Sequence, residues 1–142
     1  MKKLIFIALA IFTFSSCVRD NFITEVVLPD VWEDDFRILR SQWQLAEDEL
    51  GNPYFWASRT INELNMEVFT YGQMQAFFVT ARGALAPLPF SELFEDEHGN
   101  RWGEHFTIEF EHRRITFIMR SDDLASVLPV RPFYDFNVRF LW

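Results

Sequence analysis

Three histidines stand at intervals of seven residues, at His98, His105 and His112. Imidazole is a common ligand of transition metals, so His105, Glu109 and His112 could in principle form a metal site. A strand, however, points alternate side chains to one face, which groups Glu109 with His105 and leaves His112 to the turn that follows. We therefore expect a polar, solvated strand face here, with no metal and no cofactor bound.

Glu109 and Glu111 are the carboxylates whose spacing comes closest to a catalytic pair. A glycosidase places two carboxyl groups about 5–10 Å apart across a cleft. Residues two apart on a strand instead stand side by side, and the chain contains no Gly-x-Ser-x-Gly motif. We therefore assign no catalytic residue. The alternative is a glycan-acting hydrolase that uses paired carboxylates among Glu49, Glu97, Glu109 and Glu111.

Two acidic segments share one pattern, because residues 47–52 read EDELGN and residues 95–100 read EDEHGN. Oxygen ligands on a glycine-containing loop suit Ca²⁺, but neither segment has the alternating ligand spacing of a calcium loop, so we expect two solvated hairpin tips. A tryptophan follows each tip, at Trp56 and Trp102. Because aromatic residues dominate binding interfaces, Trp56 and Trp102 are candidate ligand or partner contacts, with core packing as the alternative.

The composition excludes several function classes. The chain has 142 residues, of which 49% are hydrophobic and 24% charged, and its formal net charge is −8. This acidic balance argues against nucleic acid as a partner, because binding a phosphate backbone needs clustered cations. Lys2 and Lys3 are the only lysines. Once the N-terminal segment is removed, no lysine is left for a Schiff base or a phosphate-binding loop.

The first 16 residues are typical of a secretory signal peptide. Two lysines precede an apolar run over residues 4–14, which has 11 residues. A helix that spans a bilayer needs roughly 20. The only cysteine, Cys17, follows two serines, and the segment resembles a bacterial lipoprotein signal, in which cleavage precedes an acylated (palmitate-bearing) cysteine. The alternative is an ordinary cleaved signal with an accidental cysteine.

Beyond residue 36 the apolar residues mostly alternate, which is the period of half-buried strands. The segments with this pattern are residues 37–43, 54–59, 73–80, 106–110, 115–119 and 134–142, and residues 22–28 could add an edge strand. Trp43 and Trp142 are in phase with their strands and are expected in the core. About seven short strands predict an all-β fold, an antiparallel β-sandwich or partly open barrel.

We expect three parts along the chain. Residues 1–16 form the lipoprotein signal peptide, residues 17–35 the lipidated cysteine and a tether, and residues 36–142 a single β-sandwich domain. Residues 81–89 are expected as a loop. Because the chain ends in an apolar strand, we expect that strand to be paired inside a sheet.

One segment, residues 61–71, breaks the alternation. Residues 60–63 read TINE, which fits a capping box, and Gly72 stands where a glycine commonly ends a helix. This predicts a short helix over residues 61–71. A strand over residues 64–71 is the alternative, because Leu64, Met66 and Val68 also alternate.

The sequence also resembles a family of small all-β lipoproteins and secreted proteins of Bacteroidota that have no assigned activity. The residues that carry the resemblance are Trp43, Thr60 and Ile61 with Gly72, Leu88 to Phe90, the paired strands near residues 105–120, and Phe136 to Phe140. The resemblance covers most of residues 36–142. It implies the location and the fold, and it supplies no catalytic residue.

The expected function is that of a lipid-anchored cell-envelope protein in the outer membrane. Acylated Cys17 would bind the membrane, and the sandwich would act as a non-enzymatic binding or structural module for a protein or glycan partner. Besides the hydrolase, a third possibility is a subunit that assembles through its terminal strand. This last alternative predicts an open sheet edge or a large apolar patch near residues 136–142.

Overall fold

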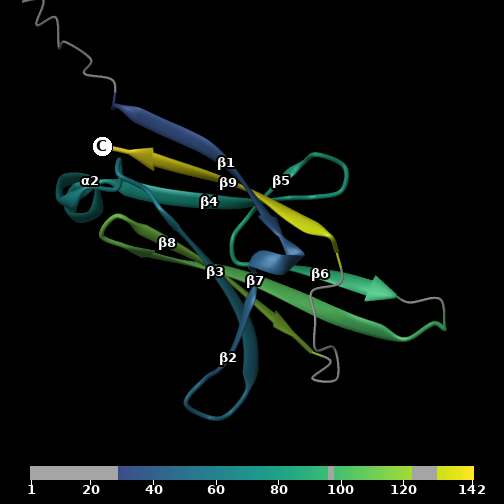
Figure 1. The fold of residues 1–142 in the computed structure, drawn as a ribbon. Coiled ribbons are helices and arrows are strands. Elements are labelled where there is room, and N and C mark those ends of the chain that lie inside the picture. The colour runs from purple at the N-terminus through teal and green to yellow at the C-terminus, as the bar shows by residue number, and fades with distance from the viewer. Residues whose placement is uncertain (1–28, 96–97, 123–130) are drawn as a thin grey trace, which may run out of the picture.

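The protein is an antiparallel β-sandwich. A computed structural model describes residues 29–95, 98–122 and 131–142. Two sheets lie face to face (Figure 1), one with the strand order β1-β9-β4-β5 and the other with the order β2-β3-β8-β7-β6. Within the described residues the sheets do not close into a barrel. The prediction of an all-β sandwich with one short helix is therefore confirmed.

In the described ranges, nine strands, one α-helix and one turn of 3-10 helix form these layers. In chain order they are β1 (Val31–Leu39), the 3-10 turn η1 (Arg40–Gln42), β2 (Gln44–Glu47), β3 (Pro53–Thr60), α2 (Met66–Tyr71), β4 (Gln73–Val79), β5 (Leu85–Pro87), β6 (Phe90–Glu95), β7 (Arg101–Glu111), β8 (Arg114–Ser121) and β9 (Phe133–Leu141). The β7–β8 hairpin and strand β3 lie where the sequence predicts them. The strand predicted over residues 37–43 is wrong, because the chain leaves β1 at Leu39, turns at Arg40–Gln42 and enters β2 only at Gln44. The loop expected over residues 81–89 contains β5. Strands β5 and β6 were not expected.

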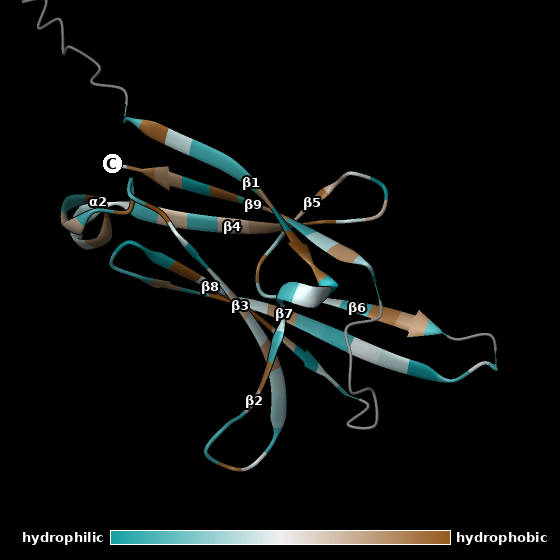
Figure 2. Cartoon of the chain, viewed as in Figure 1, coloured by the Kyte–Doolittle hydropathy of each residue, from teal (hydrophilic) through white to brown (hydrophobic). Residues whose placement is uncertain are grey.

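The core lies between the sheets and consists mainly of phenyl rings. Phe78 and Phe136 of the four-stranded sheet, and Phe106 and Phe117 of the five-stranded sheet, are fully buried. The ring centroids of Phe78 and Phe106 are 4.6 Å apart, as are those of Phe117 and Phe136. Figure 2 shows the polar and apolar residues interleaved along the strands. Burying each such ring stabilises the fold by roughly 1.5–3 kcal/mol.

Strand β9 occupies the middle of the four-stranded sheet. It pairs with β1 on one side, where Val31 lies opposite Leu141, and with β4 on the other, where Gln73 lies opposite the same residue. The prediction that the terminal strand is paired inside a sheet is thus confirmed. The open edge that assembly through this strand would need is not there, because both sides of β9 are taken.

The two tryptophans expected in the core differ. Trp43 is buried, and its ring meets that of Tyr134 edge-on. Trp142, by contrast, is 39% exposed. It lies one residue beyond β9, where its backbone exchanges hydrogen bonds with Asp30, so it stands at the end of the sheet.

The helix is shorter than predicted. Helix α2 begins at Met66, because the side chain of Asn65 accepts hydrogen bonds from the backbone N–H groups of Glu67 and Val68. The capping box over residues 60–63 was therefore wrong. Gly72 does end the helix, but its φ is −78°. A Cβ there would lie 2.5 Å from the carbonyl oxygen of Val68, so space and not backbone conformation requires glycine.

The expected boundary of the domain also shifts. Strand β1 begins at Val31, before residue 36, where we expected the domain to begin. Cys17 and the possible edge strand over residues 22–28 lie outside the described residues.

Candidate functional site

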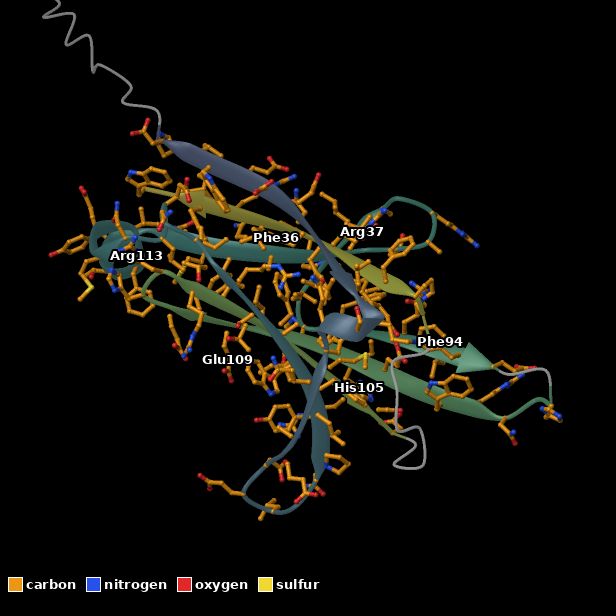
Figure 3. The ribbon with its side chains drawn as sticks, viewed as in Figure 1. Phe36, Arg37, Phe94, His105, Glu109 and Arg113 are labelled. Carbon is orange, nitrogen blue, oxygen red and sulfur yellow. The ribbon has the colours of Figure 1, made fainter. Side chains whose placement is uncertain are left out.

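The outer face of the five-stranded sheet, which is the face turned away from the other sheet, carries a row of polar and aromatic side chains. Strand register places Ser91 of β6 opposite His105 of β7, and His105 opposite Arg120 of β8. The guanidinium of Arg120 lies over the ring of Tyr54 on β3, 5.1 Å from its centroid. Figure 3 shows His105 and Glu109 on this side of the sheet. Four neighbouring strands thus contribute to one surface.

A hollow of about 480 Å³ lies on this face. Its aromatic lining is Trp56 and Tyr54, which project from the same side of β3. The other residues lining it are Glu47, Asp48, Glu49, Glu109, Glu111, Arg114, Thr116, Ile118 and Arg120. The hollow therefore combines aromatic rings with charged groups of both signs, and acids outnumber arginines.

Asp48 fixes the position of Arg120 at the edge of this hollow. Nη1 of Arg120 donates to Oδ2 of Asp48 over 2.9 Å, and the backbone N–H of Asn52 donates to Oδ1 over the same distance. The hydrogen bond from Asn52 outweighs the effect of burial and, with Arg120, lowers the pKa of Asp48 from 3.8 to about 2. Asp48 is consequently charged at every physiological pH, and the predicted acidic hairpin tip has a definite role in orienting an arginine.

Next to Arg120, three side chains form a hydrogen-bonded chain. Oγ of Ser91 lies 2.7 Å from Nδ1 of His105, and Nε2 of His105 lies 2.6 Å from Oδ1 of Asp122. If Nε2 carries the proton, Nδ1 is free to accept the Ser91 hydroxyl proton. Gly103 makes room for this chain, because a Cβ there would lie 2.5 Å from Oδ2 of Asp122.

This chain has the residue types of a serine hydrolase with the ring nitrogens exchanged. In the usual triad the acid binds Nδ1 and the serine binds Nε2. Here the side chain of His105 is 42% exposed and that of Asp122 is 61% exposed. Water therefore screens the interactions that a buried triad would strengthen.

The structure separates the two tryptophans that the sequence singles out. Trp56 lies on the outer face, opposite Ile118. Trp102 projects from the other face of the same sheet, where its ring stacks on Phe94 with the centroids 5.8 Å apart. The two rings therefore do not belong to one surface, and Trp56 alone lines the hollow.

The acids and histidines singled out in the sequence are also placed. Glu49, Glu109 and Glu111 line the hollow, while Glu97 lies outside the described residues. His105 faces outward on β7, and His112 is exposed in the turn before β8. Among the described residues, no group of three His, Cys, Asp or Glu side chains is arranged to hold a metal ion.

Three residues of this face, Ser91, Arg120 and Asp122, were missed in the sequence. They lie 14, 15 and 17 positions from His105, and only the strand register brings them to it. One local signal was present. A glycine inside a strand commonly marks a close approach by another group, and Gly103 marks that of Asp122.

A second polar cluster was also missed, on the inner side of the same sheet. Glu92 and Glu104 lie opposite each other on β6 and β7, and Glu104 is only 1% exposed. Tyr134 donates to Oε2 of Glu104 over 2.8 Å, and Arg131 donates to Oε1 of Glu92 over 2.7 Å. Burial raises the pKa of Tyr134 above its ordinary value. This cluster connects the two sheets at the end of the core.

A second hollow lies on the opposite sheet, and charged side chains in its lining are paired, as they are in the first hollow. The second hollow has a volume of about 530 Å³ on the outer face of the four-stranded sheet. Arg37 there already makes two hydrogen bonds to Asp135, and Asn137 donates to both Glu33 and Asp35. No tryptophan lines it. The outer face of the five-stranded sheet is therefore the candidate site.

No protein-family model, curated protein or solved structure matches this chain. In the part of the chain that the structure describes, no helix is both long and apolar enough to cross a membrane.

Proposed function

We propose that the chain is a lipid-anchored protein of the cell envelope, held at the outer membrane by acylated Cys17, whose sandwich binds a glycan without catalysing a reaction. The observation that carries the binding proposal is the hollow on the outer face of the five-stranded sheet, with Trp56 and Tyr54 beside Arg120. The signal sequence and the position of Cys17 support the anchor.

The lining of the hollow suits a carbohydrate. The face of an aromatic ring carries negative charge density, which attracts the weakly positive C–H groups of a sugar ring, so Trp56 and Tyr54 provide stacking surfaces. Arginine and carboxylate groups beside them can donate to and accept from sugar hydroxyls. Five acids and two arginines line the hollow. This balance favours a neutral glycan over an anionic one.

Substitution of Trp56 tests the binding proposal. Mature protein is run by affinity electrophoresis through gels that contain soluble neutral β-glucan, mannan or xylan. We expect at least one of these polymers to retard the wild type, and Trp56→Ala to weaken that binding about tenfold or more. Tyr71→Ala is the matched control, because Tyr71 is an aromatic residue that is 83% exposed on α2, away from the hollow.

Two results would contradict the glycan proposal. One is a wild type that none of the three polymers retards, and the other is a Trp56→Ala variant that binds as well as the wild type does. The anchor is tested separately by acyl labelling and membrane fractionation of the intact chain and of Cys17→Ser. We expect label and membrane association only with Cys17 present, and label in both forms would disprove acylation at this residue.

The hydrogen-bonded chain of Ser91, His105 and Asp122 favours a second candidate, hydrolysis of an ester on such a glycan. Oγ of Ser91 would attack the ester carbonyl while Nδ1 of His105 takes the hydroxyl proton. The alcohol would leave with that proton, and water would then cleave the acyl-serine in the same way. A fluorophosphonate probe should label the wild type, and neither Ser91→Ala nor Gly103→Ala should react. A wild type that stays unlabelled rules this chemistry out.

The hydrolase that uses paired carboxylates is the other alternative, because acids from different strands line the same hollow. Glu49 follows β2, whereas Glu109 belongs to β7, and both line the same hollow. Loss of glycan cleavage in Glu109→Gln, with glycan binding retained, would favour this alternative over simple binding.

A further inference from the structure

Large apolar side chains are exposed together at one end of the sandwich. The residues are Val31, which is 59% exposed, Met66 at 63%, Phe69 at 37%, Tyr71 at 83% and Trp142 at 39%. They come from the start of β1, from α2 and from the residue after β9. We call this surface the α2 end.

The backbone brings these segments together. Val31 and Gln73 both lie opposite Leu141, on its two sides. The backbone of Trp142 exchanges hydrogen bonds with Asp30. A Cβ on Gly72 would lie 3.1 Å from the carbonyl oxygen of Leu141, so the end of α2 lies against the end of β9. Figure 1 shows α2, the end of β9 and the start of β1 at the same end of the molecule.

The fold leaves a large part of this apolar surface exposed. Helix α2 has six residues, and Val68 is the only one that it buries. Met66, Phe69 and Tyr71 turn outward instead. A tryptophan and a tyrosine beside smaller apolar residues form the combination that membrane interfaces favour, because these rings have an apolar body and a polar tip.

The length of chain between Cys17 and the α2 end indicates that this surface contacts the membrane that holds the anchor. The described chain begins at Pro29, directly before Asp30 and β1. Twelve residues, 17–28, precede it, and they reach roughly 40 Å even when fully extended. A lipid on Cys17 would therefore keep a bilayer within about 40 Å of this end of the sandwich, which is the end nearest to the anchor.

We propose that the α2 end sits in the interface of the membrane that anchors the protein. This inference depends on the proposed lipid anchor. The strands of the five-stranded sheet would then run away from the bilayer, because β3 and β8 connect at this end to residues 61–65 and to Arg113, whose backbone N–H donates to Leu64. The face with the hollow would stand upright beside the membrane and remain accessible to a glycan.

The charges at the α2 end indicate that apolar contact, and not electrostatic attraction, would hold it on the membrane. Among the described residues, the acids at this end are Asp30, Glu63, Glu67 and Glu111, and the arginines are Arg113 and Arg114. Figure 3 shows Arg113 beside α2. Since acids outnumber arginines, attraction to anionic lipid cannot hold the α2 end on a bilayer. We therefore expect seating on neutral phosphatidylcholine that high salt does not weaken.

The test supplies the anchor chemically, so that it does not depend on acylation in the cell. The chain from Cys17 to Trp142 is coupled through its only thiol to a maleimide lipid in phosphatidylcholine vesicles, with or without brominated acyl chains that quench tryptophan. The same measurement on Trp142→Phe isolates the contribution of Trp142. We expect the bromolipid to quench Trp142 in the coupled protein, equally at low and at high salt.

Two triple variants show whether the α2 end is responsible. Met66→Ser with Phe69→Ser and Tyr71→Ser should abolish the quenching of Trp142. The matched control combines Leu45→Ser, Leu50→Ser and Leu93→Ser. These three leucines lie outside the α2 end and are 55%, 87% and 83% exposed. This control should keep the quenching, and circular dichroism establishes that both variants are folded.

Absence of Trp142 quenching in the coupled wild type would overturn the inference, and this result does not depend on whether any variant folds. The inference would also be overturned if the wild type forms a dimer in solution and the α2 triple variant is a monomer. A second copy of the chain would then cover this surface. Neither result bears on native acylation or on glycan binding, which are measured separately.

Discussion

At the scale of single residues, hydrogen bonds to charged side chains determine what the outer face can do. Asp48 and Arg120 come from a hairpin tip and from a strand 72 residues further on, and their ion pair is closed at 2.9 Å. Each side chain of the pair also contacts a second group. The backbone N–H of Asn52 donates to Asp48, and the guanidinium of Arg120 lies over the ring of Tyr54.

The charge of Asp48 should appear in the pH dependence of stability. Its folded pKa of about 2 lies below its ordinary value of 3.8, so its stabilising effect is complete above about pH 4 and is lost as the pH falls toward 2. We expect wild type to be more stable than Asp48→Asn at neutral pH, and this advantage to disappear over that range. Thermal unfolding of both proteins measures it, and a difference that stays constant down to pH 2 would contradict the assignment.

The pH dependence expected from Tyr134 is the reverse, because its contribution to stability is lost at high pH. Burial raises the pKa of its phenol above 10.0, so its hydrogen bond to Glu104 stabilises the fold below about pH 10, and the effect is lost as the pH rises. Tyr134→Phe removes the hydroxyl and should cost about 1–3 kcal/mol at neutral pH. Chemical denaturation of both proteins tests this value. An ultraviolet titration in which Tyr134 ionises without unfolding would show that the phenol is not buried in solution.

At the scale of elements, the short helix α2 depends on the residues at its two ends. Six residues form too short a helix to be stable alone, so the cap and the packing of Val68 must hold it. We expect Asn65→Ala to lower the free energy of unfolding by about 0.5–2 kcal/mol. Glu63→Ala is a control on the same loop, because Glu63 is exposed and the helix N–H groups of Glu67 and Val68 are bound by Asn65. Equal losses in the two variants would show that the cap contributes nothing.

The sequence predicts those elements whose pattern is local. The alternation of Phe106, Ile108 and Phe110 with polar residues identifies β7, and Gly51, with its φ of +80°, marks the β2–β3 turn. The start of α2 was wrong because Thr60 belongs to β3 and Ile61 and Leu64 are buried in the turn before the helix. Tertiary packing there outweighs a local capping pattern.

The candidate site could be predicted only in part. Trp56 was identified because it follows an acidic turn, and the structure places it on the hollow. Ser91, Arg120 and Asp122 could not be connected to His105 without the pairing of β6, β7 and β8. That pairing brings together residues that are far apart in the sequence. Strand β6 itself was missed because Phe90 and Phe94 are only half-buried partners of a longer strand.

At the scale of the whole molecule, the four-stranded sheet depends on one strand. Strands β1 and β4 do not pair with each other, and each pairs with β9. We expect deletion of residues 133–142 to abolish cooperative unfolding, because Phe136, Val138 and Phe140 leave the core together with the hydrogen bonds of both neighbours. Circular dichroism melting tests this. A sharp transition in the truncated chain would show that the five-stranded sheet folds alone.

The position of β9 at the end of the chain also determines when the four-stranded sheet can form. Strands β1 and β4 are complete by residue 79, and β9 begins only at residue 133, 54 residues later. Until β9 has emerged, whether from the ribosome or on the far side of a membrane, β1 and β4 lack their shared neighbour and are exposed to wrong pairing. The charges of Glu33, Asp34 and Asp35 along β1 oppose such pairing, so the acidic edge protects the nascent chain as well as the finished fold.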